Sequence, residues 1–175
     1  MELNQLEVQR SVKEMYLRVD PEFKHKLLKV PGGETFKLCY QCGTCTATCP
    51  VARFTDDYRP NILIQLAKLG IRNVVYKDAV WLCVNCYSCT ERCPQGVKVA
   101  DVMRALKNMA IKEGYIPDFT RGFLSNVLNT GSAYGAIPSS RISRRSSLDL
   151  PPLPKIKLED LKKLAEMAEI LNLID

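Results

Sequence analysis

The sequence lacks long hydrophobic runs, and this absence argues against a protein that spans a membrane. Among its 175 residues, no apolar stretch approaches the ~18 to 20 residues that a helix needs to cross a bilayer. Residues 1–20 carry charge throughout and contain no apolar block of the kind found in secretory signals. We therefore expect no membrane insertion and a cytoplasmic protein.

Histidine and strand-like patterns are also scarce. The single histidine, His25, follows a lysine in a charged segment and is expected to lie on the surface rather than to act in catalysis. The sequence shows no Ser-His-Asp set, no phosphate-cradling glycine loop and no C-x-x-C-H haem motif. Alternation of apolar and polar residues at period two is rare, so the fold is predicted to be mainly α.

Cysteine, in contrast, is abundant and confined to two short stretches. The eight cysteines lie in CYQCGTCTATCP, residues 39–50, and CVNCYSCTERCP, residues 83–94. Both stretches have the spacing C-x2-C-x2-C-x3-C-P, and each cysteine of the first lies 44 residues before its counterpart in the second. In a reducing cytoplasm such thiols are more often metal ligands or redox groups than disulfides. Disulfides, zinc and iron-sulfur clusters are the three alternatives.

The third cysteine of each motif favours iron-sulfur clusters. Structural zinc typically takes two separated C-x-x-C pairs, whereas three thiolates at i, i+3 and i+6 can each bind a different iron of one cubane. This run is the bacterial ferredoxin arrangement, in which the fourth cysteine serves the other cluster. We therefore predict two 4Fe-4S clusters, the first held by Cys39, Cys42, Cys45 and Cys93, and the second by Cys83, Cys86, Cys89 and Cys49.

Clusters ligated in this way constrain both charge and function. The formal charge of +6 counts the cysteines as neutral, but two 2+ cubane cores with their thiolates would lower it to about +2. Much of the basicity that would suggest a nucleic-acid partner then disappears, and no such partner is expected. Fully ligated irons have no open position for a substrate, so we predict one-electron transfer and no catalytic residue.

The match between the two stretches continues into the segments that follow them. Three further pairs of identical residues are 44 residues apart: Asp57 and Asp101, Lys68 and Lys112, and Gly70 and Gly114. The repeated unit is thus a cysteine loop and a helix that ends at a glycine. Apolar residues at helical spacing predict one buried face on each helix: Ile62, Leu66 and Leu69 in the first, and Val102, Leu106 and Met109 in the second.

Helix signals on both sides of the repeat complete a predicted division into three parts. One helix should have Asp20 as its N-cap and Pro21 as its first residue, with Phe23 and Leu27 on one side. Another should run from Asp118 to the residue before Gly131. We predict an N-terminal extension, an α-helical ferredoxin-like dicluster domain and a C-terminal arm, over residues 1–20, 21–131 and 132–175.

The C-terminal arm is rich in Ser, Pro and Arg and is predicted to be extended until a final helix. That helix has an apolar stripe of Leu161, Leu164, Ala168 and Leu171. It could fold back on its own domain, but its place after an arm suggests a docking helix. Three arginines of the arm lack interleaved aromatics and are a weak nucleic-acid signal: Arg141, Arg144 and Arg145.

The motif pair, the 33-residue spacer between Cys49 and Cys83, and the segments YRPNILIQLAKLG and AVWLCVNCYSCTERCP resemble the C subunit of the soluble heterodisulfide reductases of methanogenic archaea. The resemblance covers Asp20 to Gly114 well and the tail loosely. It implies a non-catalytic electron-transfer subunit of methanogenesis, which relays electrons from an A subunit with flavin and iron-sulfur groups to the B subunit. The B subunit reduces the coenzyme M-coenzyme B heterodisulfide, and its CCG motifs are absent from this sequence.

The resemblance also implies partners: the A and B subunits, with a hydrogenase or formate dehydrogenase module as a further candidate. Two alternatives remain open on the sequence. One is the dicluster relay subunit of another cytoplasmic oxidoreductase, and the other is a zinc-bound or cluster-bound nucleic-acid adaptor that uses the arginine arm.

Overall fold

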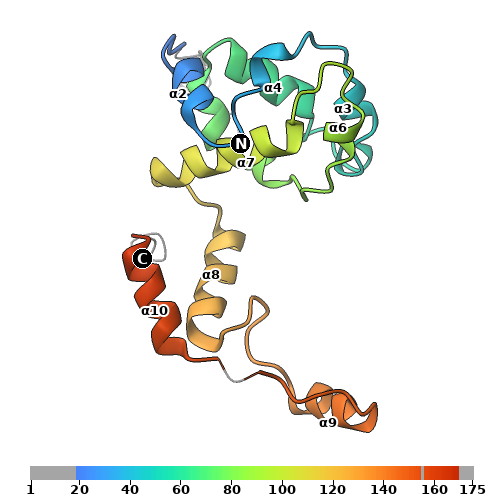
Figure 1. Ribbon diagram of the computed structural model, residues 1–175, viewed down its shortest axis with the longest axis vertical. Coiled ribbons are helices and arrows are strands. Elements are labelled where there is room, and N and C mark those ends of the chain that lie inside the picture. Colours follow the sequence, from blue (N-terminus) through green and yellow to red (C-terminus); the bar gives the residue numbers. More distant parts are fainter. Residues whose placement is uncertain (1–18, 155, 170–175) are drawn as a thin grey trace, which may run out of the picture. The chain divides into compact units, whose positions relative to one another are not determined.

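The computed structural model describes residues 19–154 and 156–169, which form helices joined by loops (Figure 1). Within these ranges the β pairing is a single antiparallel bridge between Val19 and Ile71. The prediction of a mainly α fold is confirmed. No helix in the described ranges is both long and apolar enough to cross a membrane. The predicted N-terminal extension lies outside the described residues, except for its last two.

The helices, with 3-10 helices marked η, are α2 (Phe23–Lys29), η1 (Phe36–Leu38), α3 (Thr44–Ala47), η2 (Val51–Arg53), α4 (Pro60–Lys68), η3 (Arg72–Tyr76), α5 (Asp78–Trp81), α6 (Ser88–Glu91), α7 (Val99–Lys112), α8 (Asp118–Thr130), α9 (Ser139–Ser147) and α10 (Leu158–Met167). They divide into two compact units, Met1–Tyr115 and Ile116–Asp175. The unit with both cysteine motifs thus ends before the predicted boundary at residue 131, because α8 packs against α10.

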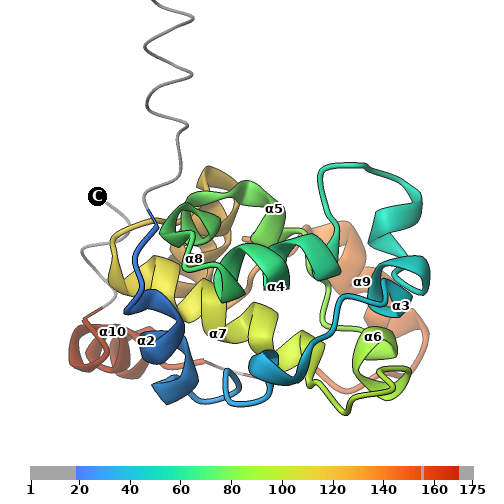
Figure 2. The same cartoon turned by 90° about the horizontal axis from the view of Figure 1, so that it is seen from above.

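Helix α7 is the central helix of the first unit, and Figure 2 shows it running between the other helices. It contacts α2, α4, α5, α6 and η3. Its apolar residues recur at i, i+3, i+4 and i+7, which gives one helix face wide enough for several neighbours. The buried side chains of this face include Val99, Val102, Met103, Leu106 and Met109. Burial of each large apolar side chain contributes about 1.5 to 3 kcal/mol.

A threonine that directly follows the third cysteine of each motif caps the next helix. The Thr46 hydroxyl accepts the Asn61 backbone N–H of α4 at 3.2 Å, and the Thr90 hydroxyl accepts the Ala100 backbone N–H of α7 at 3.1 Å. The first N–H groups of a helix have no partner within it, so each bond satisfies a donor and ties the helix to its cysteine loop.

The helices therefore repeat at a shorter spacing than the cysteine loops before them. Asn61 and Ala100 are closer together in the sequence than any two matching cysteines, and the first residues of α4 and α7 have the same shorter spacing. Three pairs of buried residues share it: Leu63 and Val102, Ile64 and Met103, and Ala67 and Leu106. Helix α4 has 9 residues and α7 has 14. Because α7 is longer, the last residues of the two helices, Lys68 and Lys112, are again as far apart in the sequence as two matching cysteines.

The predicted buried face of α4 is consequently wrong at two of its three positions, since only Leu66 packs against the core, whereas the predicted face of α7 is confirmed. Ile62 and Leu69 are 41% and 56% exposed, and Leu63 and Ile64 are buried instead. The bond to Thr46 fixes where α4 begins and therefore which of its sides faces the core. Because aliphatic residues occupy most positions from 62 to 69, the sequence is compatible with two apolar stripes.

Helix α2 buries Phe23 and Leu27 as predicted but begins at Phe23, later than expected. The side chain of Asp20 instead closes the turn before the helix, where it accepts the Glu22 backbone N–H at 2.9 Å. The Asp20 backbone N–H donates to the Gly70 carbonyl at 2.7 Å. This bond and the Val19–Ile71 bridge join the start of the described chain to the turn after α4.

In the second unit, α8 begins at Asp118 and ends at Thr130 as predicted, with Gly131 in the left-handed conformation at φ 70°. Helix α10 folds back on α8, which is one of the two alternatives left open by the sequence. Its buried side chain is Ala165, while Leu164 is 60% exposed, so the predicted stripe is misplaced. Leu171, also part of that stripe, lies outside the described residues.

The arm was predicted to be extended, but it contains helix α9 over Ser139–Ser147. Pro138 has an extended backbone and stands at the N-cap, after which arginines, which are good helix formers, recur. No residue of α9 is buried. Because the helix has no side that faces a core, apolar residues do not recur at helical spacing in this part of the sequence.

Replacing Thr46 or Thr90 with Val should lower the free energy of unfolding by ~1 to 2 kcal/mol, because the capped helix loses an acceptor. We expect the anaerobic thermal midpoint to fall by several degrees. Thr48→Val is the matched control, since the Thr48 hydroxyl only reaches back to the Thr44 carbonyl of its own helix at 3.0 Å. Equal losses for all three variants would contradict the capping role.

Candidate iron-sulfur site

The two cysteine loops lie side by side at one end of the first unit. Helices α3 and α6, which contain the third cysteine of each motif, contact each other directly, and Figures 1 and 2 show them adjacent in both views. Cys45 and Cys89 are buried on these helices, whereas the second cysteine of each motif, Cys42 or Cys86, is exposed. Each loop therefore runs from the surface into the core.

Both loops have the same backbone conformation. Gln41 and Asn85, the second residues after the first cysteine, have φ of 67° and 51°. Gly43 and Tyr87, directly after the second cysteine, have φ of 78° and 62°. The left-handed region is easy for glycine but costs a tyrosine about 1 to 2 kcal/mol. The two loops thus share left-handed residues at the same two positions.

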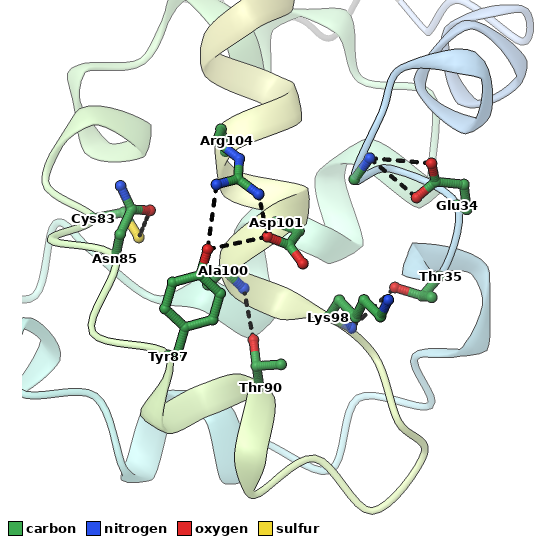
Figure 3. A network of polar contacts seen from close by, with 11 residues as sticks. Glu34, Thr35, Cys83, Asn85, Tyr87, Thr90, Lys98, Ala100, Asp101 and Arg104 are labelled. Carbon is green, nitrogen blue, oxygen red and sulfur yellow. Dashed lines mark hydrogen bonds and ion pairs between the residues drawn. The ribbon is translucent and has the colours of Figure 1, made fainter.

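The second loop stabilises its strained tyrosine through α7 (Figure 3). The Tyr87 hydroxyl donates to the Asp101 carboxylate at 3.3 Å, and Arg104 donates to the Tyr87 oxygen at 3.3 Å. Arg104 also pairs with Asp101 at 2.5 Å. Figure 3 shows the tyrosine ring pointing from its loop toward these two α7 side chains. The contacts offset the cost of the left-handed backbone and join the loop to the central helix.

One pocket brings together cysteines from both motifs. It is lined by Cys39, Cys42 and Cys45 of the first loop and by Cys93, the last cysteine of the second. Apolar groups such as Ile64, Val97 and Val99 line the same pocket. This thiol set is the one predicted for the first cluster, and its donors are those that a 4Fe-4S core takes.

The spacing of the thiols does not suit a single metal ion. Four sulfurs bound to one zinc at 2.3 Å lie about 3.8 Å from one another. Among the described residues, no group of three or more Cys, His, Asp or Glu side chains is close enough to hold one ion. All eight cysteines are free thiols, so they form no disulfide framework. In the predicted 4Fe-4S core each thiol binds a different iron, so the thiols need not meet at one ion.

Polar groups contact the sulfurs at equivalent places in the two loops. The amide side chains of Gln41 and Asn85 lie 3.3 and 3.6 Å from the Sγ atoms of Cys39 and Cys83. The hydroxyls of Thr44 and Ser88 lie 3.3 and 3.6 Å from those of Cys42 and Cys86. The Val97 backbone N–H also donates to Cys93 Sγ at 3.3 Å. Such contacts orient metal ligands and affect reduction potentials.

The same surroundings divide the thiols into two chemical groups. Hydrogen bonds from Thr44 lower the pKa of Cys42, and those from Ser88 lower the pKa of Cys86. Burial raises the pKa of Cys45 and of Cys89 to about 11, and neighbouring thiolates add to this effect. In the cluster-free protein the exposed thiols therefore ionise well before the buried ones.

Three residues near the cysteines were not predicted. Tyr58 is 1% exposed, and burial together with the charge of Cys83 raises the pKa of its hydroxyl. Lys68 and Lys107 donate to the backbone carbonyls of Cys39 and Cys83. Aligning the two cysteine stretches pairs Lys68 with Lys112, so only the shorter repeat of the helices could have identified Lys107.

Alkylation of the cluster-free protein should reach Cys42 and Cys86 first, because the thiolate is the reactive form. Labelling of Cys42 should level off below the ordinary thiol pKa of 9.0, whereas labelling of Cys45 should still rise above it. Iodoacetamide time courses over a range of pH, followed by peptide mass spectrometry, measure both rates. Equal rates at Cys42 and Cys45 would contradict this loop arrangement.

Comparisons with known proteins agree with this geometry. The sequence model of the family described as "4Fe-4S dicluster domain" matches residues 35–97, which include all eight cysteines. The C subunit of the H(2):CoB-CoM heterodisulfide,ferredoxin reductase of Methanothermobacter thermautotrophicus is 36% identical over 155 residues, which are 88% of this chain and 82% of the relative.

Two other relatives are similar over nearly the same length. The iron-sulfur C subunit of the CoB--CoM heterodisulfide reductase of Methanopyrus kandleri is 39% identical over 142 residues, which are 78% of this chain and 73% of the relative. The C subunit of the ferredoxin:CoB-CoM heterodisulfide reductase of Methanosarcina mazei is 34% identical over 145 residues, which are 79% and 88% of the two chains. The chain therefore belongs to the family of heterodisulfide reductase C subunits, carries two 4Fe-4S clusters and is an electron-transfer component of an oxidoreductase complex.

Proposed function

We propose that this chain is the non-catalytic relay between the A and B subunits of a cytoplasmic heterodisulfide reductase. It would pass electrons from the A subunit, with its flavin and iron-sulfur groups, to the B subunit, where the coenzyme M-coenzyme B heterodisulfide is reduced. The observation that carries this proposal is the direct contact between two four-cysteine loops in a member of the C-subunit family. When bound, each 4Fe-4S cluster accepts and gives up one electron.

The residues around the loops suit a relay better than a catalyst. With eight cysteines for eight irons, every iron has a protein ligand and none offers a position to a substrate. Buried groups such as Ile64, Val97 and Val99 exclude water from the first pocket. Cys42 and Cys86 reach the surface at equivalent points of the two loops. Electrons could therefore enter near one motif and leave near the other.

We further propose the crossed ligand sets: Cys39, Cys42, Cys45 and Cys93 for one cluster, and Cys83, Cys86, Cys89 and Cys49 for the other. The pocket that Cys93 shares with the first three cysteines of the other motif supports this assignment. The contact of α3 with α6 supports it as well, because each fourth cysteine comes directly after the C-cap residue of one of these helices. Crossed ligation would make each loop necessary for both clusters.

The names of the relatives support a proposal about partners. The name of the Methanothermobacter relative includes H(2), and that of a Methanococcus maripaludis relative includes H(2)/formate. A complex of this chain with the A and B subunits, and with a hydrogenase or formate dehydrogenase module upstream, is the corresponding proposal here. The exposed apolar side chains beside the loops, Tyr40 and Val84 among them, are available for such contacts.

Replacing Cys93 with Ser should damage the same cluster as replacing Cys39 with Ser. Crossed ligation places both sulfurs on one cluster, so both variants should lose the same EPR signal and keep the other. Cys83→Ser is the matched control and should remove the opposite signal. If Cys93→Ser and Cys83→Ser remove the same signal, the crossed assignment is wrong.

Anaerobic affinity isolation of this chain from its native cell should recover the A and B subunits in fixed ratio. The isolated complex should reduce the heterodisulfide, and the chain alone should not, because it offers no open iron. Mass spectrometry and a thiol-release assay measure the two results. Recovery with the components of a different oxidoreductase would support another relay role instead.

A further inference from the structure

We propose that Lys107 raises the reduction potential of the cluster held by the second cysteine motif, and that Lys68 does the same at the first motif. This inference rests on the two clusters that the chain carries, and not on the identity of its partners. It is also independent of crossed ligation, because Cys39 and Cys83 belong to different clusters with or without it.

The two lysines occupy equivalent places beside the loops. Lys107 Nζ donates to the Cys83 carbonyl oxygen at 2.9 Å. Lys68 Nζ donates to the Cys39 carbonyl oxygen at 2.5 Å and to the Lys37 carbonyl oxygen at 3.3 Å. The two lysines have the same spacing along the sequence as the capped amides of their helices. Each cysteine loop thus has one ammonium group fixed at the backbone of its first ligand.

The charge of each lysine is not neutralised by a carboxylate. Among the described residues, the ion pairs involve other side chains, and neither Lys68 nor Lys107 takes part in one. Lys107 is more enclosed than a typical surface lysine, with its Nζ 5.8 Å from the centre of the Trp81 ring. An enclosed charge is less screened by water and therefore acts more strongly on its neighbours.

The direction of the effect follows from electrostatics. Reduction adds one negative charge to a centre that the thiolates already make negative. An ammonium group fixed at the backbone of a cluster ligand stabilises this added charge, so the reduced form is favoured and the potential rises. At the effective dielectric constant of a partly buried site, the effect is on the order of tenfold in the reduction equilibrium. For a one-electron couple, tenfold corresponds to about 59 mV.

A simpler role is also compatible with these contacts, since a lysine that binds a carbonyl oxygen can hold a loop without changing a potential. The two roles differ in a measurable way. Loss of a loop anchor lowers thermal stability or cluster content, whereas loss of the charge shifts one midpoint potential. Lys112 provides a matched control because it is the partner of Lys68 in the sequence alignment, yet it is exposed at the far end of α7.

The experiment is a redox titration of the full chain with both clusters loaded, monitored by EPR. Lys107→Gln should move one midpoint to a more negative potential, by roughly tenfold in the equilibrium constant. Lys68→Gln should move the other midpoint in the same direction, and Lys112→Gln should move neither. Unchanged potentials in Lys107→Gln, or an equal shift in Lys112→Gln, would overturn the proposal.

Two further measurements separate charge from anchoring. Lys107→Arg keeps the charge and should leave the potential within about twofold of the parent value in the equilibrium constant, whereas a shift equal to that of Lys107→Gln would overturn the electrostatic role. Iron and sulfide content is measured for every variant. If Lys107→Gln fails to load both clusters, the other two variants decide the question. An unchanged potential in Lys107→Arg together with a negative shift in Lys68→Gln supports the proposal. Any other pair of results contradicts it.

Discussion

The contact between α3 and α6 is the constraint on which the rest of the first unit depends. It brings two loops of four thiols together, although a long helical spacer separates them in the sequence. Thr46 and Thr90 then bind the first turns of α4 and α7, so the rotation of each helix is set by the cysteine loop before it. The apolar core is therefore built outward from the cluster-binding loops. Because metal binding and folding are coupled in such domains, cluster loading should stabilise the whole unit.

Much of this arrangement could be predicted from the sequence because its signals are local. The cysteine spacing determines the type of cluster, since three thiols at three-residue steps suit a cubane and not a single zinc ion. Helix α8 was predicted from its first residue to its last, because Asp118 follows a proline and Gly131 can adopt the left-handed cap. The buried face of α7 was also predicted, because its polar residues leave a single apolar stripe.

Other features depend on contacts between distant segments and could not be predicted. The orientation of α4 is decided by a hydrogen bond from Asn61 to Thr46, while its own aliphatic residues permit two orientations. The residues beside the clusters could not be predicted either. Lys68 aligns with Lys112 in the sequence repeat, but in the structure the lysine in the equivalent position is Lys107. Helix α9 has no buried side chain, so no apolar period in the sequence could indicate it.

Two adjacent clusters in one chain would form a path for single electrons. The most direct test is a stepwise anaerobic reduction of the purified chain, with EPR spectra recorded at each step. We predict uptake of two electrons per chain and, at full reduction, a spectrum broadened by magnetic coupling, because the loops that hold the clusters are in contact. Uptake of one electron, or two signals that remain independent at full reduction, would contradict the account.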